Sequence, residues 1–268
     1  QDQLEARRAI RCNKYVNFDS LFESLEAGHL KLLRGSWLME ERNLRRFVRH
    51  QDLPEEAFWT VREMRSQLRV LSFVALSYCW LHPINPDPEG VHLRVLQHAL
   101  RLRLGVKGPG RIQDVAIFID YLSLPQAGED TSLSTAHPAP GSARTQVELV
   151  SFKKGLAEVN VTYAHQQIEV WLLKWVPEAE SRKYMSRGWP YFEQAVSSLI
   201  KDATKLVELG GGPRSDSFRF QSWVALFEHQ AAGRSPPLDP DYFEQALQGK
   251  TFTSHSDGGE DRARADRL

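Results

Sequence analysis

Three runs of consecutive apolar residues mark the middle of the chain. They are VLSFVALSY (70–78), VAIFID (115–120) and IEVWLL (168–173), and each is rich in β-branched and aromatic residues and lacks a helical period. Runs of this kind are typical of strands in a parallel sheet that helices cover on both faces. We therefore predict three buried strands and, with helical segments between them, an α/β domain.

One amphipathic helix is predicted between the second and third strands, because its apolar residues are spaced three and four apart (Leu149, Phe152, Leu156, Val159 and Tyr163). Before it, the polar stretch EDTSLSTAHPAPGSAR (129–144) is typical of a loop.

A second helix is predicted from Trp189, because Pro190 suits the first helical turn. At about 100° per residue its apolar face is expected to continue through Ile200 to Val207, and Glu193 falls on that same face. Since an unpaired buried charge is costly, this carboxylate needs a partner or a chemical role. We expect either an ion pair with Arg187 or a carboxylate that faces a pocket.

The rest of the chain divides by composition into four predicted parts. Residues 1–66 are charged and form a helical N-terminal extension, with a helix start at QDLPEEAFW, where Asp52 is placed to cap. Residues 67–210 form the α/β domain, residues 211–250 a helical segment centred on SFRFQSWVALFEHQ, and residues 251–268 a disordered tail. The first residue is not methionine, so we expect the chain to be part of a longer protein.

Composition narrows the classes of partner. Lys plus Arg and Asp plus Glu are 34 each, so no overall field favours nucleic acid. We interpret the arginines at 62, 65 and 69 as a solvated helix face rather than a stripe for an acidic partner. No apolar run approaches the roughly 20 residues that span a bilayer. With two cysteines and no metal-binding spacing, we expect a cytoplasmic chain without a metal, and neither nucleic acid nor membrane as partner.

Polar and aromatic residues follow the first two predicted strands. The first strand ends with Ser77, Tyr78 and Trp80, and the second with Asp120. Ligands of open parallel sheets bind at the carboxyl ends of the strands, where an aromatic pair beside an acid is able to stack a planar ring and hold a ribose hydroxyl. The alternative is that the aromatic residues pack and that Asp120 caps a turn.

Three blocks of the sequence together resemble a known family. ALSYCW (75–80), FIDYLSLPQ (118–126) and RGWPYFEQ (187–194) are similar to the signature blocks of the heterokaryon-incompatibility (HET) domain, a divergent relative of the TIR domain. The chain departs from the HET pattern at four positions, where the family has glycine, cysteine, isoleucine and asparagine: Leu81, Ser123, Leu124 and Pro125.

The resemblance implies a TIR-like, flavodoxin-like parallel sheet and a role in intracellular signalling or self-recognition. In TIR domains that cleave NAD, a catalytic glutamate lies four residues after a helix-start tryptophan, the spacing of Trp189 and Glu193. The resemblance therefore implies that Glu193 is the catalytic residue and that NAD is a substrate rather than a cofactor. It also implies a substrate site made of Ser77, Tyr78, Trp80, Asp120, Arg187 and Trp189. The alternative that it leaves open is a catalytically silent module that binds a protein partner or a second copy of itself.

Overall fold

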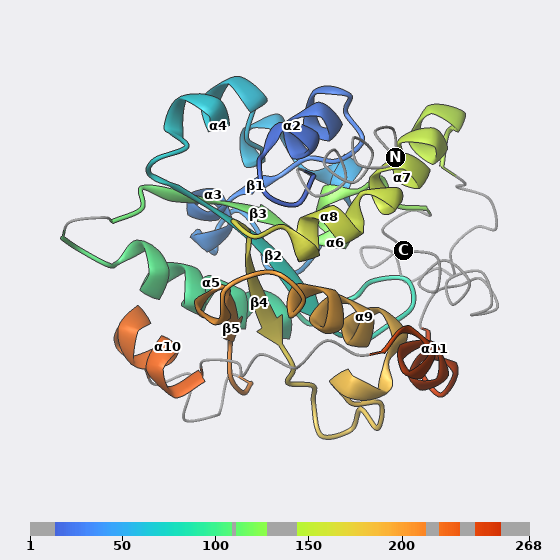
Figure 1. Cartoon of the computed structure of the whole chain (residues 1–268). Helices are drawn as coiled ribbons and strands as arrows, with labels where there is room; N and C mark the ends of the chain where they lie inside the picture. The colour runs from blue at the N-terminus through green and yellow to red at the C-terminus, as the bar shows by residue number, and fades with distance from the viewer. Residues whose placement is uncertain (1–13, 109–110, 128–143, 213–219, 231–238, 253–268) are drawn as a thin grey trace, which may run out of the picture.

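A twisted β-sheet forms the centre of the computed structural model, which describes residues 14–108, 111–127, 144–212, 220–230 and 239–252 (Figure 1). In this part of the chain the sheet has five strands in the order β1-β3-β2-β4-β5. The edge strand β1 runs antiparallel to β3, and the other neighbours are parallel. The strands are β1 (Leu33–Arg34), β2 (Leu71–Tyr78), β3 (Asp114–Phe118), β4 (Glu169–Leu173) and β5 (Leu206–Glu208).

The sheet confirms the predicted α/β fold, because the three apolar runs are β2, β3 and β4. Every residue of these three strands is buried. In chain order, the four parallel strands are arranged second, first, third, fourth, which is the order of a flavodoxin-like sheet. The short β1 lies within the predicted N-terminal extension, so that region contributes a strand to the same sheet.

Helices cover both faces of the sheet (Figure 1). One face packs against α3 (Gly35–Met39), α5 (Val91–Leu104) and α10 (Trp223–Gln230). The other packs against α2 (Asp19–Glu26), α4 (Val61–Gln67), α7 (Gln146–Ala157), α8 (Val159–Ala164) and α9 (Gly188–Ser197). Shorter elements are η1 (His50–Asp52), η2 (Glu55–Ala57), α6 (Asp120–Ser123), η4 (Tyr184–Ser186) and η5 (Ala203–Lys205), and α11 (Pro240–Gln248) packs outside α9.

Two helix predictions are wrong in extent. The segment 149–163 is two helices, because Glu158 ends α7 and begins α8. The helix that carries Glu193 ends at Ser197, so Ile200 is 41% exposed and Val207 belongs to β5. The hydroxyl groups of Ser197 and Ser198 bond back to backbone carbonyls four residues earlier, a pattern that favours bending or ending a helix.

The predicted helix start at Asp52 is also wrong. The Asp52 carboxylate pairs with Arg49, and only single 3-10 turns form there. The helix instead begins at α4, where Thr60 and Glu63 form a capping box. Residue 59 stays extended because its N–H donates to the carbonyl of Leu32 beside the sheet. A tertiary backbone bond therefore overrides the local start signal.

Helix α5 was not predicted, and an unusual cap begins it. Its N-cap is Gly90, which has no side chain to cap with, and the buried carboxylate of Asp87 accepts from the N–H groups of His92 and Leu93 instead. Gly90 has φ +67°, and a Cβ there would lie 2.0 Å from the carbonyl oxygen of Arg45. Only glycine meets both conditions.

The predicted tail (251–268) and the predicted polar loop (129–144) fall largely outside the described residues. Residues 253–268 and 128–143 are not described, so the predicted disorder and the predicted loop stay predictions there. Thr251 and Phe252 are described, and the expectation of disorder is wrong for both. Thr251 forms a β-bridge with Arg187, at the start of α9.

Replacing Gly90 with alanine is expected to destabilise the fold by about 2–5 kcal/mol, because it adds left-handed backbone strain to a steric clash with the backbone. Gly28 is the matched control, since its φ is +69° and a Cβ there would have nothing within 4 Å. Urea unfolding of both variants measures the difference. Equal losses in Gly28→Ala and Gly90→Ala would contradict the close packing at Gly90.

Candidate functional site

A buried hydrogen bond joins the end of β2 to α9. The hydroxyl of Ser77 donates to Oε2 of Glu193, and both side chains are buried, with Glu193 7% exposed. The Ser77 oxygen also lies 2.5 Å from the hydroxyl of Tyr184. Since serine has a single proton to donate, Tyr184 is the donor to Ser77. The chain Tyr184–Ser77–Glu193 therefore ends on the glutamate.

Burial raises the pKa of Glu193 well above the ordinary glutamate value. The hydrogen bond from Ser77 opposes the rise, the charge of Asp120 adds to it, and a hydrogen bond with Tyr163 also opposes it. The Tyr163 hydroxyl is also 2.8 Å from the carbonyl oxygen of Leu76, and burial outweighs the effect of both hydrogen bonds to Glu193. The site thus favours a neutral carboxylic acid.

A second group surrounds Asp120 at the end of β3. Its carboxylate accepts from the Tyr78 hydroxyl at 2.7 Å, from the Trp80 indole N–H at 2.9 Å and from the Tyr121 backbone N–H at 2.6 Å. Burial raises the pKa of Asp120, and the bonds from Tyr78 and Trp80 oppose that rise. Asp120 and Trp80 are partly exposed, whereas Tyr78 is buried.

The two groups lie on opposite faces of the sheet. Consecutive residues of a strand point to opposite sides, so Ser77 and Tyr78 cannot face one hollow. Tyr78 packs among the buried residues on the face that α5 covers, edge-on to His92. Ser77 points to the other face, where it donates to Glu193 of α9. The charge of Asp120 still reaches Glu193, which places both carboxyl groups near the same end of β2. The predicted single site is thus divided by the strand.

Arg187 bonds to the backbone of Trp80, a residue of the second group. Its guanidinium, 1% exposed, donates to the carbonyl of Trp80 at 2.5 Å and forms an ion pair with Glu180 at 3.1 Å. Although burial acts to raise it, hydrogen bonds from Arg182 and the charge of Arg187 hold the pKa of Glu180 at about 2. The expected partner of Arg187 was Glu193, and the ion pair that it forms is with Glu180.

Trp189 is placed away from both groups. Its half-buried ring packs edge-on against Phe192 and Phe252, at centroid distances of 5.8 and 6.3 Å, on the outer side of α9. Although Trp189 and Glu193 share one helix, the structure does not bring the Trp189 ring to Ser77, Tyr78 or Asp120.

Two residues of the network were missed from the sequence. Tyr163 was assigned only to a helix face, and Tyr184 precedes the third block without any motif of its own. A hydrophobic pattern treats tyrosine as apolar, so it carries no signal of where the hydroxyl group is directed. The partners of these hydroxyls come from β2, about a hundred residues earlier along the chain.

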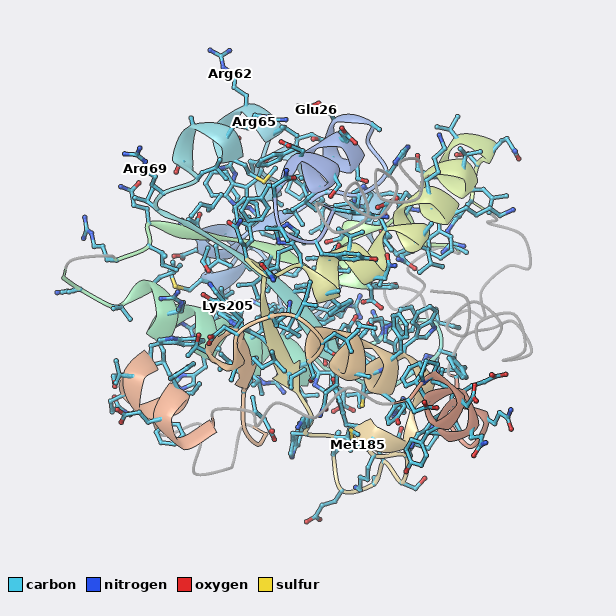
Figure 2. The ribbon with its side chains drawn as sticks, in the orientation of Figure 1. Glu26, Arg62, Arg65, Arg69, Met185 and Lys205 are labelled. Atoms are coloured by element: carbon cyan, nitrogen blue, oxygen red, sulfur yellow. The ribbon has the colours of Figure 1, made fainter. Side chains whose placement is uncertain are left out.

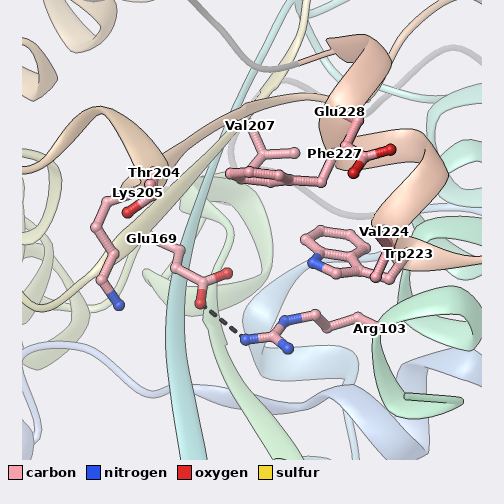
Figure 3. Close-up of a pocket in the computed structure, with 9 residues that line it drawn as sticks. All are labelled: Arg103, Glu169, Thr204, Lys205, Val207, Trp223, Val224, Phe227 and Glu228. Atoms are coloured by element: carbon pink, nitrogen blue, oxygen red, sulfur yellow. Dashed lines mark hydrogen bonds and ion pairs between the residues drawn. The ribbon is translucent and has the colours of Figure 1, made fainter.

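A groove of about 400 Å³ lies at the opposite, amino end of β4 and β5 (Figure 3). Its polar side holds the ion pair of Arg103 with Glu169, 3.0 Å long, and Ser72 also donates to Glu169. Lys205 and Glu228 add one charge of each sign, so the groove as a whole favours neither anions nor cations. Its apolar wall is Val207, Trp223, Val224 and Phe227. Glu193 and Asp120 do not line it.

The arginines of α4, Arg62 and Arg65, and Arg69 in the turn after it point outward from the molecule (Figure 2). Arg62, Arg65 and Arg69 are exposed, and Arg65 pairs with Glu26 at 3.3 Å. This arrangement agrees with a solvated helix face for Arg62 and Arg65, whereas Arg69 lies beyond the end of the helix. Within the described residues, no helix is long and apolar enough to cross a membrane, and no group of three or more potential metal ligands occurs.

No family model, curated protein or solved structure matches the chain.

Replacing Glu193 with glutamine is expected to raise stability relative to wild type as the pH increases. Unfolded glutamate ionises near 4.5, whereas the folded side chain stays protonated to a higher pH, so the wild type loses stability above about pH 4.5. Glutamine has no proton to lose. The gain grows to about 1.4 kcal/mol for each unit of raised pKa.

Urea unfolding of the wild type and Glu193→Gln between about pH 5 and 8 measures this difference. Glu178→Gln is the control, because Glu178 is exposed in the loop before η4. A stability difference that does not change with pH would contradict the protonated, buried state of Glu193.

Proposed function

We propose that the chain is a HET-type, TIR-like domain that acts in intracellular signalling or self-recognition, and that it cleaves the ribose–nicotinamide bond of NAD with Glu193 as the catalytic residue. The observation that carries the proposal is the contact among the three resembling blocks. Block 75–80 bonds to block 118–126 through Asp120, and to block 187–194 through Glu193 and Arg187. Segments far apart in the chain thus meet at one end of the sheet.

The topology of the sheet favours ligand binding at that end. Strands β2 and β4 are neighbours, with Tyr78 opposite Leu173, and the helices that follow them, α5 and α9, lie on opposite faces. The chain thus leaves β2 toward one face of the sheet and β4 toward the other. Doubly wound sheets bind ligands at such a point, beyond the carboxyl ends of the strands. The partly exposed Trp80 and Asp120 are at this end, and we expect them to contact the nucleotide.

The proposed reaction needs one ionised carboxylate. As the bond from ribose to nicotinamide breaks, positive charge develops on the ribose, and a nearby anion stabilises that transition state. Nicotinamide leaves as a neutral ring from a cationic substrate, so no acid has to protonate it, and water supplies the hydroxyl group of the product. Since Glu193 is buried and favours its neutral form, catalysis requires that it lose its proton and leave Ser77.

The second candidate is a catalytically silent module that works by self-association or by binding a protein partner. The observation that favours it is the burial of Glu193, because a carboxyl group that is 7% exposed and hydrogen-bonded to Ser77 also serves as a link between β2 and α9. In that case the glutamate is structural, and the surface of the domain carries the function.

Nicotinamide release from NAD separates the two candidates. We expect the wild type to release nicotinamide at a rate that rises with pH, as Glu193 ionises, and Glu193→Gln to be slower by about a hundredfold or more. The exposed control Glu178→Gln should match the wild type. Equal and negligible release by all three proteins, at every protein concentration, would overturn the catalytic proposal. Light scattering that increases with concentration, in wild type and Glu193→Gln alike, would then support self-association.

A further inference from the structure

The start of α9 is covered by a segment far along the chain. This covering segment, residues 239–252, consists of α11 and the extended residues that follow it. Its helix packs on the outer face of α9, where Phe243 stacks on Tyr191 at 5.6 Å and Leu247 is fully buried with Phe192. The ammonium of Lys250 lies 4.4 Å from the Tyr191 ring centroid.

Backbone hydrogen bonds attach the covering segment to the turn before Glu193. The N–H of Gly188, the first residue of α9, donates to the carbonyl of Thr251 at 2.8 Å, and the N–H of Thr251 donates to Ser186 at 3.0 Å. The first N–H groups of a helix have no partner within it, and the N-cap Arg187 forms no side-chain cap bond. Thr251 therefore supplies the cap that the helix lacks.

Side chains also pack where the covering segment meets the start of α9. A Cβ on Gly188 would lie 2.1 Å from the Phe252 ring, so the ring rests directly on the backbone of that glycine. The ring also contacts Trp189, which is the helix-start tryptophan of the third block. The absence of a side chain at position 188 thus allows this contact.

The covering segment holds both elements that enclose Glu193. Ser186 ends η4, which begins with Tyr184, and Gly188 begins α9, which carries Glu193. The hydrogen-bonded chain Tyr184–Ser77–Glu193 persists only while these two elements keep their positions. The other titrating groups that interact with Glu193 are Asp120, Tyr163 and Cys79, which come from elements that the covering segment does not hold.

We infer that residues 239–252 are an autoinhibitory element, which keeps Glu193 enclosed by fixing η4 and the first turn of α9, and whose release opens the site. This regulatory role rests on the proposed function, because it concerns the same glutamate. It predicts a closed form, as observed, and an active form in which Thr251 and Phe252 have left Ser186 and Gly188.

The inference is tested on the whole chain with two releasing variants and one control. Phe252→Ala removes the ring from Gly188, and Thr251→Pro removes the N–H that donates to Ser186. Gln245→Ala is the control, since Gln245 is exposed on α11. Hydrogen exchange reports whether the start of α9 opens, and unchanged protection of β2 reports that the fold is intact. The pKa of Glu193 is then measured by carbon-13 NMR, together with nicotinamide release.

Both releasing variants are expected to exchange faster at residues 184–193, to lower the pKa of Glu193 by about one unit or more, and to release nicotinamide several-fold faster. Gln245→Ala should behave as wild type. A wild-type pKa of Glu193 in variants whose α9 start has opened would overturn the inference, and so would unchanged exchange in both variants. A lowered pKa without nicotinamide release by any variant would support the enclosure and contradict the proposed activity.

Discussion

The hydrogen bond from Ser77 to Glu193 is the contact on which the rest of this structure depends. It places a carboxyl group inside the protein, where an ionised carboxylate without a cation would be strongly destabilising. Burial favours the neutral acid, which is hydrogen-bonded to Ser77 and Tyr163, and Tyr184 in turn bonds to Ser77. The same arrangement ties the central strand to α9. Any chemistry at Glu193 must therefore begin by breaking a contact that stabilises the fold.

The alternation of strand residues explains why the candidate site has two parts. Ser77 and Tyr78 are neighbours in sequence, but they serve opposite faces of β2, so one meets Glu193 and the other Asp120. Each carboxyl group has its own set of donors, and each pKa is raised by burial. Two carboxyl groups near one strand end also oppose each other's ionisation, since the charge of Asp120 raises the pKa of Glu193 further. Loss of a proton from one makes loss from the other harder.

Much of the fold was predictable because buried parallel strands leave a strong pattern. The runs 70–78, 115–120 and 168–173 form β2, β3 and β4 of the sheet, in the predicted class of fold. The short β1 was not predictable, since two residues carry no periodicity. Helix α5 was missed because its cap comes from Asp87, three residues before the N-cap, rather than from a local capping motif. The end of α9 was missed because an apolar residue such as Ile200 fits a helical face whether or not the helix continues.

The candidate site was predictable only in part. Its location at the strand ends follows from the fold class, and the burial of Glu193 follows from the helical face. Its partners depend on where side chains of other segments are directed, as with Tyr184 and the Arg187–Glu180 pair. Infrared spectroscopy of the protein with labelled glutamate tests the central claim most directly. At neutral pH, the difference between wild type and Glu193→Gln should contain the carbonyl band of one protonated carboxylic acid. A carboxylate band in its place would contradict the account.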